Sequence, residues 1–251
     1  MITEYNRPDS VASALALLAR KTPQTHILAG GTGLILRKSE DFAVVDIQDL
    51  SLNSIQKDGE RIRVGACVTL QQLLDSADLP EAIRTAARTE SSFNIRQAAT
   101  LGGTIASANG HSPLLAILLA DNVEVYLAQQ EKPILLGELL PLRAESLQRQ
   151  LITEIAISDK PFLAYEKISK TPDDVPLIVA SVAQWPGGRT RVVVGGSLDV
   201  PKLAMDGTSP TGADVAASNL FSGTDLYLSE MAGILVNRCL QKLKTEEIHE
   251  H

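Results

Sequence analysis

The sequence predicts a mixed fold of helices and strands, arranged in two units. The chain has 251 residues, long enough to bury a sizeable core and to form two compact domains. The stretch Phe42–Ile47 is apolar apart from Asp46, which is typical of a strand in a parallel or fully covered sheet. The pattern of the sequence changes near Asp159-Lys160-Pro161, so the boundary between the two units is expected near residue 160.

The first stretch is expected to form a helix, a strand and a turn. Asp9 or Ser10 can cap a helix that carries Val11, Leu15 and Leu18 on one face. A short buried strand is expected over residues 26–29, and it leads directly into the glycine-rich turn 30–33.

The middle of the chain is expected to be rich in helices. Thr69 can cap a helix through Leu70, Leu73 and Leu74. Further helices are expected over residues 79–89, with Ile83, Ala86 and Ala87 inward, and over the apolar run 113–119. Strands are expected over residues 61–66 and 123–127, a polar connection over 91–97, and a second glycine-rich loop over 98–104.

After residue 160 the pattern predicts a second, smaller unit. Residues 162–168 and 176–184 have the composition of strands or helices, and the turn Trp185–Gly188 leads to a strand over 190–194. A loop of small residues is expected over 207–212, and a closing helix over 226–244.

Composition excludes several classes of protein. The net charge of -7 argues against nucleic acid as a partner, because phosphate binding needs a basic surface. The longest apolar run, Leu114–Ala120, is far shorter than the roughly 20 residues of a membrane helix. Cys67 and Cys239 stand in no metal-like spacing, so no metal site is expected. Two reduced thiols, and opening residues without a signal pattern, predict a cytoplasmic protein.

Two glycine-rich segments are the strongest candidates for a binding site. Gly30-Gly31-Thr32 and Gly102-Gly103-Thr104 share a core in which absent Cβ atoms allow close approach of backbone N–H groups to a phosphate. The alternative for the first segment is a plain tight turn. Neither segment has the P-loop pattern, and neither has the glycine spacing of a Rossmann dinucleotide site. The residues alone therefore indicate two phosphate-capable loops.

The pair of segments, in this order and spacing, resembles a known family. Residues 28–34 (LAGGTGL) and 100–106 (TLGGTIA) are similar to the paired motif of the FAD-binding subunit of molybdenum hydroxylases. That family includes the medium subunits of xanthine dehydrogenase and of aerobic carbon monoxide dehydrogenase. The resemblance extends over the whole chain, through residues 6–8 (NRP), 165–169 (YEKIS) and 191–196 (RVVVGG).

The resemblance implies an α+β protein with an FAD-binding domain of the vanillyl-alcohol-oxidase (PCMH) type, made of two α/β subdomains, and a small α+β C-terminal domain. The first domain would span 1–160, and 161–251 would resemble the C-terminal domain of carbon monoxide dehydrogenase flavoproteins. Gly30, Gly31 and Thr32 would contact the pyrophosphate of FAD, as would Thr100, Gly102 and Gly103, which also lie on the ribityl side. Ile105 would lie near the flavin ring. The implied cofactor-binding residues are Leu28, Ala29, Gly30, Gly31, Thr32, Gly33, Leu34, Thr100, Leu101, Gly102, Gly103, Thr104, Ile105, Asn109, Ser112 and Lys167.

Two positions depart from the family pattern. Gly33 stands where the family usually has Asp, and residues 107–113 lack the usual carboxylate that supports the adenosine ribose. Asn109 or Ser112 could bind a ribose hydroxyl as a neutral partner. Of the two segments, the second follows the family pattern more closely. Lys167 matches a family lysine near the cofactor, with a solvated surface lysine as the alternative.

The implied function is electron transfer. An iron–sulfur small subunit would deliver electrons to the FAD of this subunit, which would pass them to a soluble acceptor, while a molybdopterin large subunit would hydroxylate the substrate. No catalytic residue is expected in this chain. One alternative is an assembly subunit that has lost FAD, and another is a stand-alone flavin enzyme. The substitution Gly102→Val is expected to abolish FAD binding and to leave the fold intact.

Overall fold

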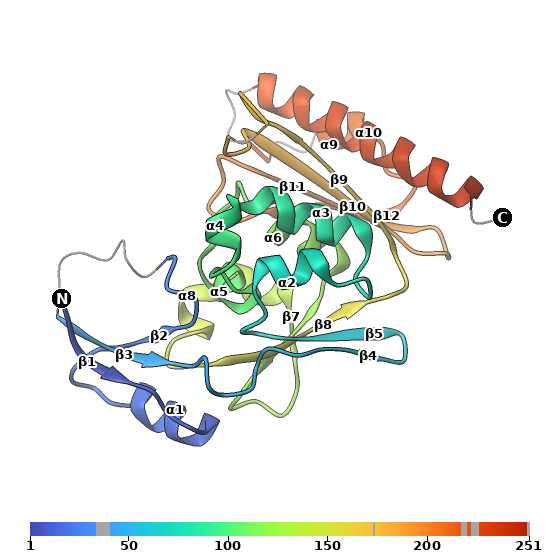
Figure 1. Ribbon diagram of the computed structural model, residues 1–251. Helices are drawn as coiled ribbons and strands as arrows, with labels where there is room; N and C mark the ends of the chain where they lie inside the picture. Colours follow the sequence, from blue (N-terminus) through green and yellow to red (C-terminus); the bar gives the residue numbers. More distant parts are fainter. Residues whose placement is uncertain (34–40, 173, 217–219, 222–225, 250–251) are drawn as a thin grey trace.

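The computed structural model describes residues 1–33, 41–172, 174–216, 220–221 and 226–249. These residues form three sheets with helices packed between and around them (Figure 1). A small sheet lies near the N-terminus, a second sheet carries the middle of the chain, and a third belongs to the C-terminal part. Runs of strands and runs of helices follow one another along the chain, so the predicted mixture of the two is observed.

The N-terminal sheet is parallel and small. Its order is β1-β3-β2, and both outer strands pair with β3 in parallel. All of β3 is buried, as expected from its apolar run, whereas β2 is only half-buried because it lies at the sheet edge. Ser10 caps α1 by accepting a hydrogen bond from the Ser13 N–H. The elements are β1 (Ile2–Asn6), α1 (Val11–Leu18), β2 (Thr25–Leu28) and β3 (Phe42–Asp46).

The second sheet has five antiparallel strands in the order β4-β5-β8-β6-β7. In β5 the predicted alternation is present only in part, because its last two residues are both buried. The strands are β4 (Ile55–Asp58), β5 (Arg61–Gly65), β6 (Glu124–Leu127), β7 (Ile134–Leu135) and β8 (Ile152–Ser158). Three short helical segments follow β7, namely α7 (Leu136–Leu139), the 3-10 turn η2 (Leu140–Leu142) and α8 (Arg143–Ser146).

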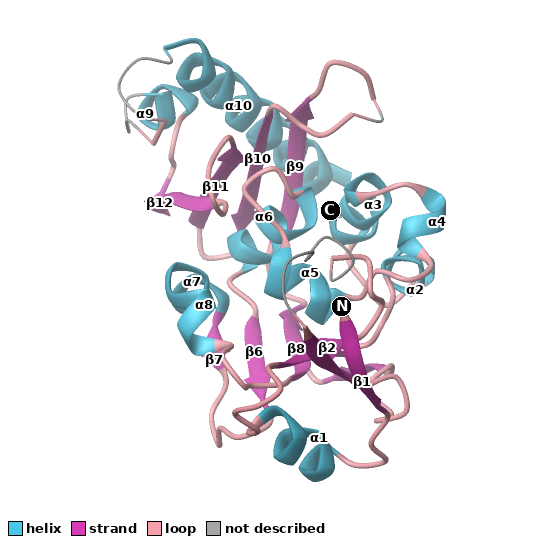
Figure 2. Ribbon diagram, turned by 90° about the vertical axis from the view of Figure 1, so that its left-hand side faces the viewer, coloured by secondary structure: helices cyan, strands magenta, loops and turns pink. Residues whose placement is uncertain are grey.

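A layer of helices separates this sheet from the C-terminal sheet (Figure 2). Thr69 forms the predicted cap of α2 and also a capping box with Gln72. The short helix α4 occupies the segment that was expected to be a polar connection. The helices are α2 (Leu70–Asp75), α3 (Glu81–Glu90), α4 (Phe93–Arg96), α5 (Leu101–Ser107) and α6 (Pro113–Asp121).

The C-terminal sheet is a four-stranded antiparallel meander in the order β12-β11-β10-β9. The long helix α10 covers one face, and α6 packs against the other (Figure 1). The edge strand β12 was not expected, because most of its residues are exposed and it lacks an apolar alternation. The elements are β9 (Phe162–Ile168), β10 (Ile178–Gln184), β11 (Arg189–Gly196), β12 (Lys202–Thr208), α9 (Gly212–Ala216) and α10 (Leu226–His249).

Helix α6 is buried along its whole length. Ser112 caps its start, and the Arg191 guanidinium of β11 binds its end by donating to the carbonyl oxygens of Leu119 and Ala120. The main hydrophobic core includes this helix, together with Leu163, Val179, Ala183 and Val193 of the C-terminal sheet. The main core therefore crosses the expected boundary near residue 160, while a second cluster lies between the C-terminal sheet and α10.

Candidate flavin site

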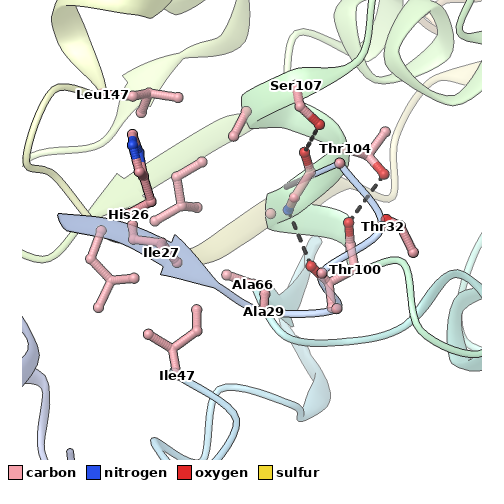
Figure 3. A pocket seen from close by; sticks show the side chains of 18 of the residues that line it. His26, Ile27, Ala29, Thr32, Ile47, Ala66, Thr100, Thr104, Ser107 and Leu147 are labelled. Carbon is pink, nitrogen blue, oxygen red and sulfur yellow. Dashed lines mark hydrogen bonds between the residues drawn. The ribbon is translucent and has the colours of Figure 1, made fainter. Parts of the chain in front are cut away.

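A cavity of about 820 Å³ opens between the N-terminal sheet, helix α5 and the segment 143–152. This volume lies in the range of pockets that enclose small-molecule ligands. Figure 3 shows His26, Ile27 and Ala29 on and after β2, with Thr100, Thr104 and Ser107 on or next to α5 opposite them. The cavity brings both predicted glycine segments together, although about seventy residues of sequence separate them.

The first segment, residues 30–33, forms a turn directly after β2. Gly31 has a φ of 73°, in the left-handed region that favours glycine. A Cβ on Gly30 would overlap the carbonyl oxygen of Ala98, so the protein's own packing requires glycine there. The interpretation as a tight turn is therefore correct for the backbone, and it does not compete with a binding role.

The backbone N–H groups of this turn have no acceptor in the part of the chain that the structure describes. None of the backbone or side-chain hydrogen bonds in that part has the N–H of Gly30, Gly31, Thr32 or Gly33 as its donor. All four residues line the cavity. Because unpaired amides near a cavity can converge on an anion, this turn offers the donors that a phosphate needs.

The second segment differs from its prediction, because it is a helix and not a loop. Thr100 is the N-cap of α5, and its Oγ1 accepts a hydrogen bond from the Gly103 N–H at 3.2 Å. The side chains of Leu101 and Ile105, one turn apart, are fully buried and hold the helix in the core. The glycine pair indicated a loop because glycine is a poor helix former, but capping and burial outweigh that preference here.

The amides of this helix start are already occupied. The N–H of Leu101 donates to Val68 O, that of Gly102 to Ala66 O, and that of Thr104 to Thr100 O, each at 2.9 Å. With Gly103 bound to Thr100, every N–H of this first turn has an acceptor in the protein. The second segment therefore shapes the cavity wall, and the first segment carries the donors that remain available.

Gly102 is needed for packing. A Cβ there would lie 2.8 Å from the Cβ of Ala66 and 3.0 Å from its carbonyl oxygen. The expectation that Gly102→Val leaves the fold intact is therefore wrong, because a valine would push α5 away from the end of β5.

The charges around the cavity are mostly positive. Arg20, Lys21, Arg143 and Arg149 line it, and Arg20 forms a two-pronged ion pair with Glu4 at 2.8 and 3.2 Å. The Arg143 guanidinium donates to Ile105 O at 3.2 Å and Ala108 O at 2.6 Å, which satisfies carbonyl groups at the end of α5. Burial lowers the pKa of Arg143. A surplus of positive charge suits a ligand that carries phosphates.

Several other described residues implied by the resemblance do not line the cavity. Ile105 and Leu101 are enclosed in the core, so Ile105 does not face the cavity where a flavin ring could reach it. Lys167 is held at the surface, where its Nζ donates to Pro172 O at 2.9 Å. Leu28 precedes the turn and is not among the lining residues, and Leu34 lies outside the described residues.

The side chains of Asn109 and Ser112 accept hydrogen bonds from nearby backbone N–H groups. The Oδ1 of Asn109 accepts from the His111 N–H at 3.0 Å, and the Oγ of Ser112 accepts from the Leu115 N–H at 2.9 Å as the cap of α6. His111 Nδ1 lies 2.7 Å from Pro176 O, which joins this segment to the loop before β10. Sequence reasoning missed Arg143 and Glu90 as lining residues, because neither belongs to a local motif.

Both cysteines are free and buried, as expected. Burial raises the pKa of Cys67 to about 11 and that of Cys239 to about 12, so both thiols are neutral and inert at physiological pH. Across the described residues, no cluster of three or more His, Cys, Asp or Glu side chains could hold a metal ion. The helices in these same ranges all fall short of the length and hydropathy that crossing a bilayer requires.

Comparison with known proteins places the chain in a family. Residues 1–157 match the model of the FAD binding domain in molybdopterin dehydrogenase. The chain is 30% identical to the protein YgfM of Escherichia coli K12, over 94% of each chain. It is also 30% identical to subunit alpha of the 6-hydroxypseudooxynicotine dehydrogenase complex of Paenarthrobacter nicotinovorans, over 95% of this chain and 93% of that one.

Carbon monoxide dehydrogenase provides both a sequence and a structural relative. The medium chain of the Afipia carboxidovorans enzyme is 25% identical over 96% of each chain. A chain in a crystal structure of the Cu,Mo carbon monoxide dehydrogenase superposes with a TM-score of 0.81 at 23% identity, over 98% of both chains. The structural likeness confirms the predicted α+β fold, and the family match confirms the resemblance. The chain thus belongs to the FAD-binding medium subunits of the molybdopterin dehydrogenase family, which are oxidoreductase subunits of the carbon monoxide dehydrogenase medium-chain type.

Proposed function

We propose that this chain binds FAD in the cavity and acts as the electron-transfer subunit of a molybdenum hydroxylase complex. The single observation that carries the proposal is the turn 30–33. Its four residues line a cavity with a positive surplus of charge, and their N–H groups have no acceptor among the described residues. This turn would hold the pyrophosphate, and the start of α5 would form the opposite wall. When bound, FAD would supply the redox chemistry, and the protein would set its position and potential.

The partners in this proposal are a molybdopterin large subunit and an iron–sulfur small subunit. The support is the family match together with the likeness to a carbon monoxide dehydrogenase medium chain along nearly the whole chain. This subunit would receive electrons from the iron–sulfur subunit and pass them to a soluble acceptor. Its own residues would bind and orient the cofactor, and would take no part in the hydroxylation of the substrate.

The direct test is titration of the purified full-length chain with FAD. We expect flavin absorbance in the purified protein, or a saturable change in flavin fluorescence on addition of FAD to the colourless protein. Absence of both signals would refute the proposal for this chain.

A variant test separates binding at the turn from general damage to the fold. Gly33 does not have a positive φ, and a Cβ there would meet only the Ser107 side chain, with its Oγ at 3.4 Å, an ordinary contact. The variant Gly33→Val is therefore expected to fold normally and to weaken FAD binding by about tenfold or more, because its side chain shields the neighbouring N–H groups. Gly207→Val is the matched control, since Gly207 lies on β12 and a Cβ there would have no heavy atom within 4 Å. Equal FAD affinity in the two variants would contradict the role of the turn.

A second candidate function is that of an assembly subunit that has lost FAD. The occupied amides of α5, with Gly33 and the carboxylate-free segment 107–113, favour this alternative. It predicts a colourless protein that binds no FAD and still co-purifies with the large and small subunits. Flavin in the assembled complex at one equivalent per copy of this chain would exclude it.

A further inference from the structure

Glu90 stands out because it is an acid in a cavity with a basic lining. Of the cavity-lining residues in the described ranges, Glu90 alone carries a carboxylate, while Arg20, Lys21, Arg143 and Arg149 are basic. It is the last residue of α3, and it is partly buried. A carboxylate in a cavity suited to phosphates needs a specific reason, because it would repel the ligand if it faced the pyrophosphate.

The carboxylate of Glu90 is fixed through one of its two oxygens. Its Oε2 accepts a hydrogen bond from Ser112 Oγ at 2.9 Å and another from the Leu114 N–H at 3.0 Å. These partners belong to the cap and first turn of α6, where backbone amides and the helix dipole favour negative charge. The position of the side chain is therefore set by a rigid, buried helix.

The second oxygen, Oε1, has no hydrogen-bond donor among the described residues. Burial raises the pKa of Glu90, whereas the two bonds to α6 and the charge of Lys167 lower it, and burial is the larger effect. Oε1 is not among the fully buried side-chain atoms that lack a partner, so it keeps some contact with solvent and a donor from a ligand can reach it.

We propose that Glu90 binds a sugar hydroxyl of the cofactor through Oε1. This inference rests on the proposed function, and it adds a residue from α3 that no sequence motif indicated. In FAD, hydroxyl groups flank the pyrophosphate on both sides, as the ribose of the adenosine half and as the ribityl chain of the flavin half. A carboxylate can only accept hydrogen bonds, so hydroxyl groups next to the pyrophosphate are its natural partners. Ser112, in the segment 107–113 that carries no carboxylate of its own, holds the Glu90 side chain in place.

The test compares Glu90→Gln with the wild type in titrations of the full chain with FAD, ADP and FMN. The carboxamide oxygen of glutamine can still accept from Ser112 and Leu114, so we expect the fold to be retained. FAD affinity is expected to fall about tenfold to a hundredfold, the range for a hydrogen bond to a charged group. A parallel loss with ADP would assign the ribose, and a parallel loss with FMN would assign the ribityl chain.

Glu81→Gln is the matched control, because Glu81 is exposed at the other end of α3 and does not line the cavity. If Glu90→Gln fails to fold, Glu90→Asp keeps the charge on a shorter side chain, and it is expected to weaken FAD binding relative to Glu81→Asp. Unchanged or tighter FAD binding in the Glu90 variants would overturn the inference while the wild type still binds FAD. Failure of the wild type to bind FAD would instead refute the proposed function itself.

Discussion

The substitution Gly102→Val is expected to destabilise the protein in the absence of any cofactor. Gly102 is buried in the first turn of α5, and its N–H donates to Ala66 O at 2.9 Å. A Cβ at this position would lie 2.8 Å from the Ala66 Cβ, closer than real Cβ atoms approach other heavy atoms. The obstacle is a Cβ fixed to the backbone, together with the backbone itself, so no flexible side chain can move aside.

Two opposing effects determine the magnitude. Replacing glycine in a helix with valine improves helix propensity by a few tenths of a kcal/mol, roughly 0.5 at most. Overpacking a buried site costs about 1–3 kcal/mol and sometimes more, and valine adds three carbons where even the first does not fit. The net loss is therefore expected to reach about 2.5 kcal/mol, which for a chain of this size lowers the melting temperature by about 5–10 °C.

The assay is thermal and urea unfolding of the apo protein, followed by circular dichroism, for Gly102→Val and for the control Gly207→Val. The control is expected within about 0.5 kcal/mol of the wild type, because its side chain projects from an exposed strand into open space. Equal midpoints for the two variants would refute the packing argument. If a Gly102 variant loses FAD binding, its stability without cofactor must therefore be measured before a contact between Gly102 and the cofactor is inferred.

Three further predictions concern the stability of the folded protein. Burial raises the pKa of Asp121 to about 7, so its protonated form stabilises the fold below pH 4, and this contribution is lost as the pH rises towards 7. Asp121→Asn should flatten that decline in differential scanning fluorimetry, and identical slopes would contradict the assignment. Arg191→Leu should cost on the order of 3 kcal/mol in urea unfolding, because the buried carbonyl oxygen of Ala120 loses its donor, and Leu119 O and Asp206 each lose one of their donors. Exposed Arg189→Leu should cost under about 1 kcal/mol. Thr69→Ala should remove the cap of α2 and about 1 kcal/mol of stability, and an unchanged midpoint would show that the capping box is dispensable.

Local sequence signals predicted those elements whose structure depends on neighbours in the chain. Thr69 and Ser10 cap the helices that they were expected to cap, and the apolar run at Phe42 became the buried central strand of a parallel sheet. The apolar run after Ser112 became a buried helix. In each case the burial pattern and the cap residue lie within one element, so periodicity and capping rules suffice.

The signals failed where distant residues decide the outcome. The helix at Gly102 depends on acceptors in Ala66 and Val68, more than thirty residues earlier, and no local pattern reveals such contacts. The cavity lining also depends on contacts between residues that are distant in sequence. Glu90 is held there by hydrogen bonds to the start of α6, and Arg143 by hydrogen bonds to the end of α5. The resemblance predicted that the two glycine segments lie together, and both line one cavity, but the assignment of available donors to one segment required the three-dimensional structure.

The complete burial of α6 affects local unfolding of the C-terminal sheet. Its side chains pack against the C-terminal sheet on one side and against α3 and β8 on others, and its ends are bound by Ser112 with Glu90 and by Arg191. Separation of the C-terminal sheet would expose to water a helix that is apolar except for Asp121, so partial opening there is expected to cost nearly as much as global unfolding. Amide hydrogens of α6 and β10 should therefore belong to a single slow-exchanging unit, and a fragment ending near residue 160 should not remain monomeric in solution.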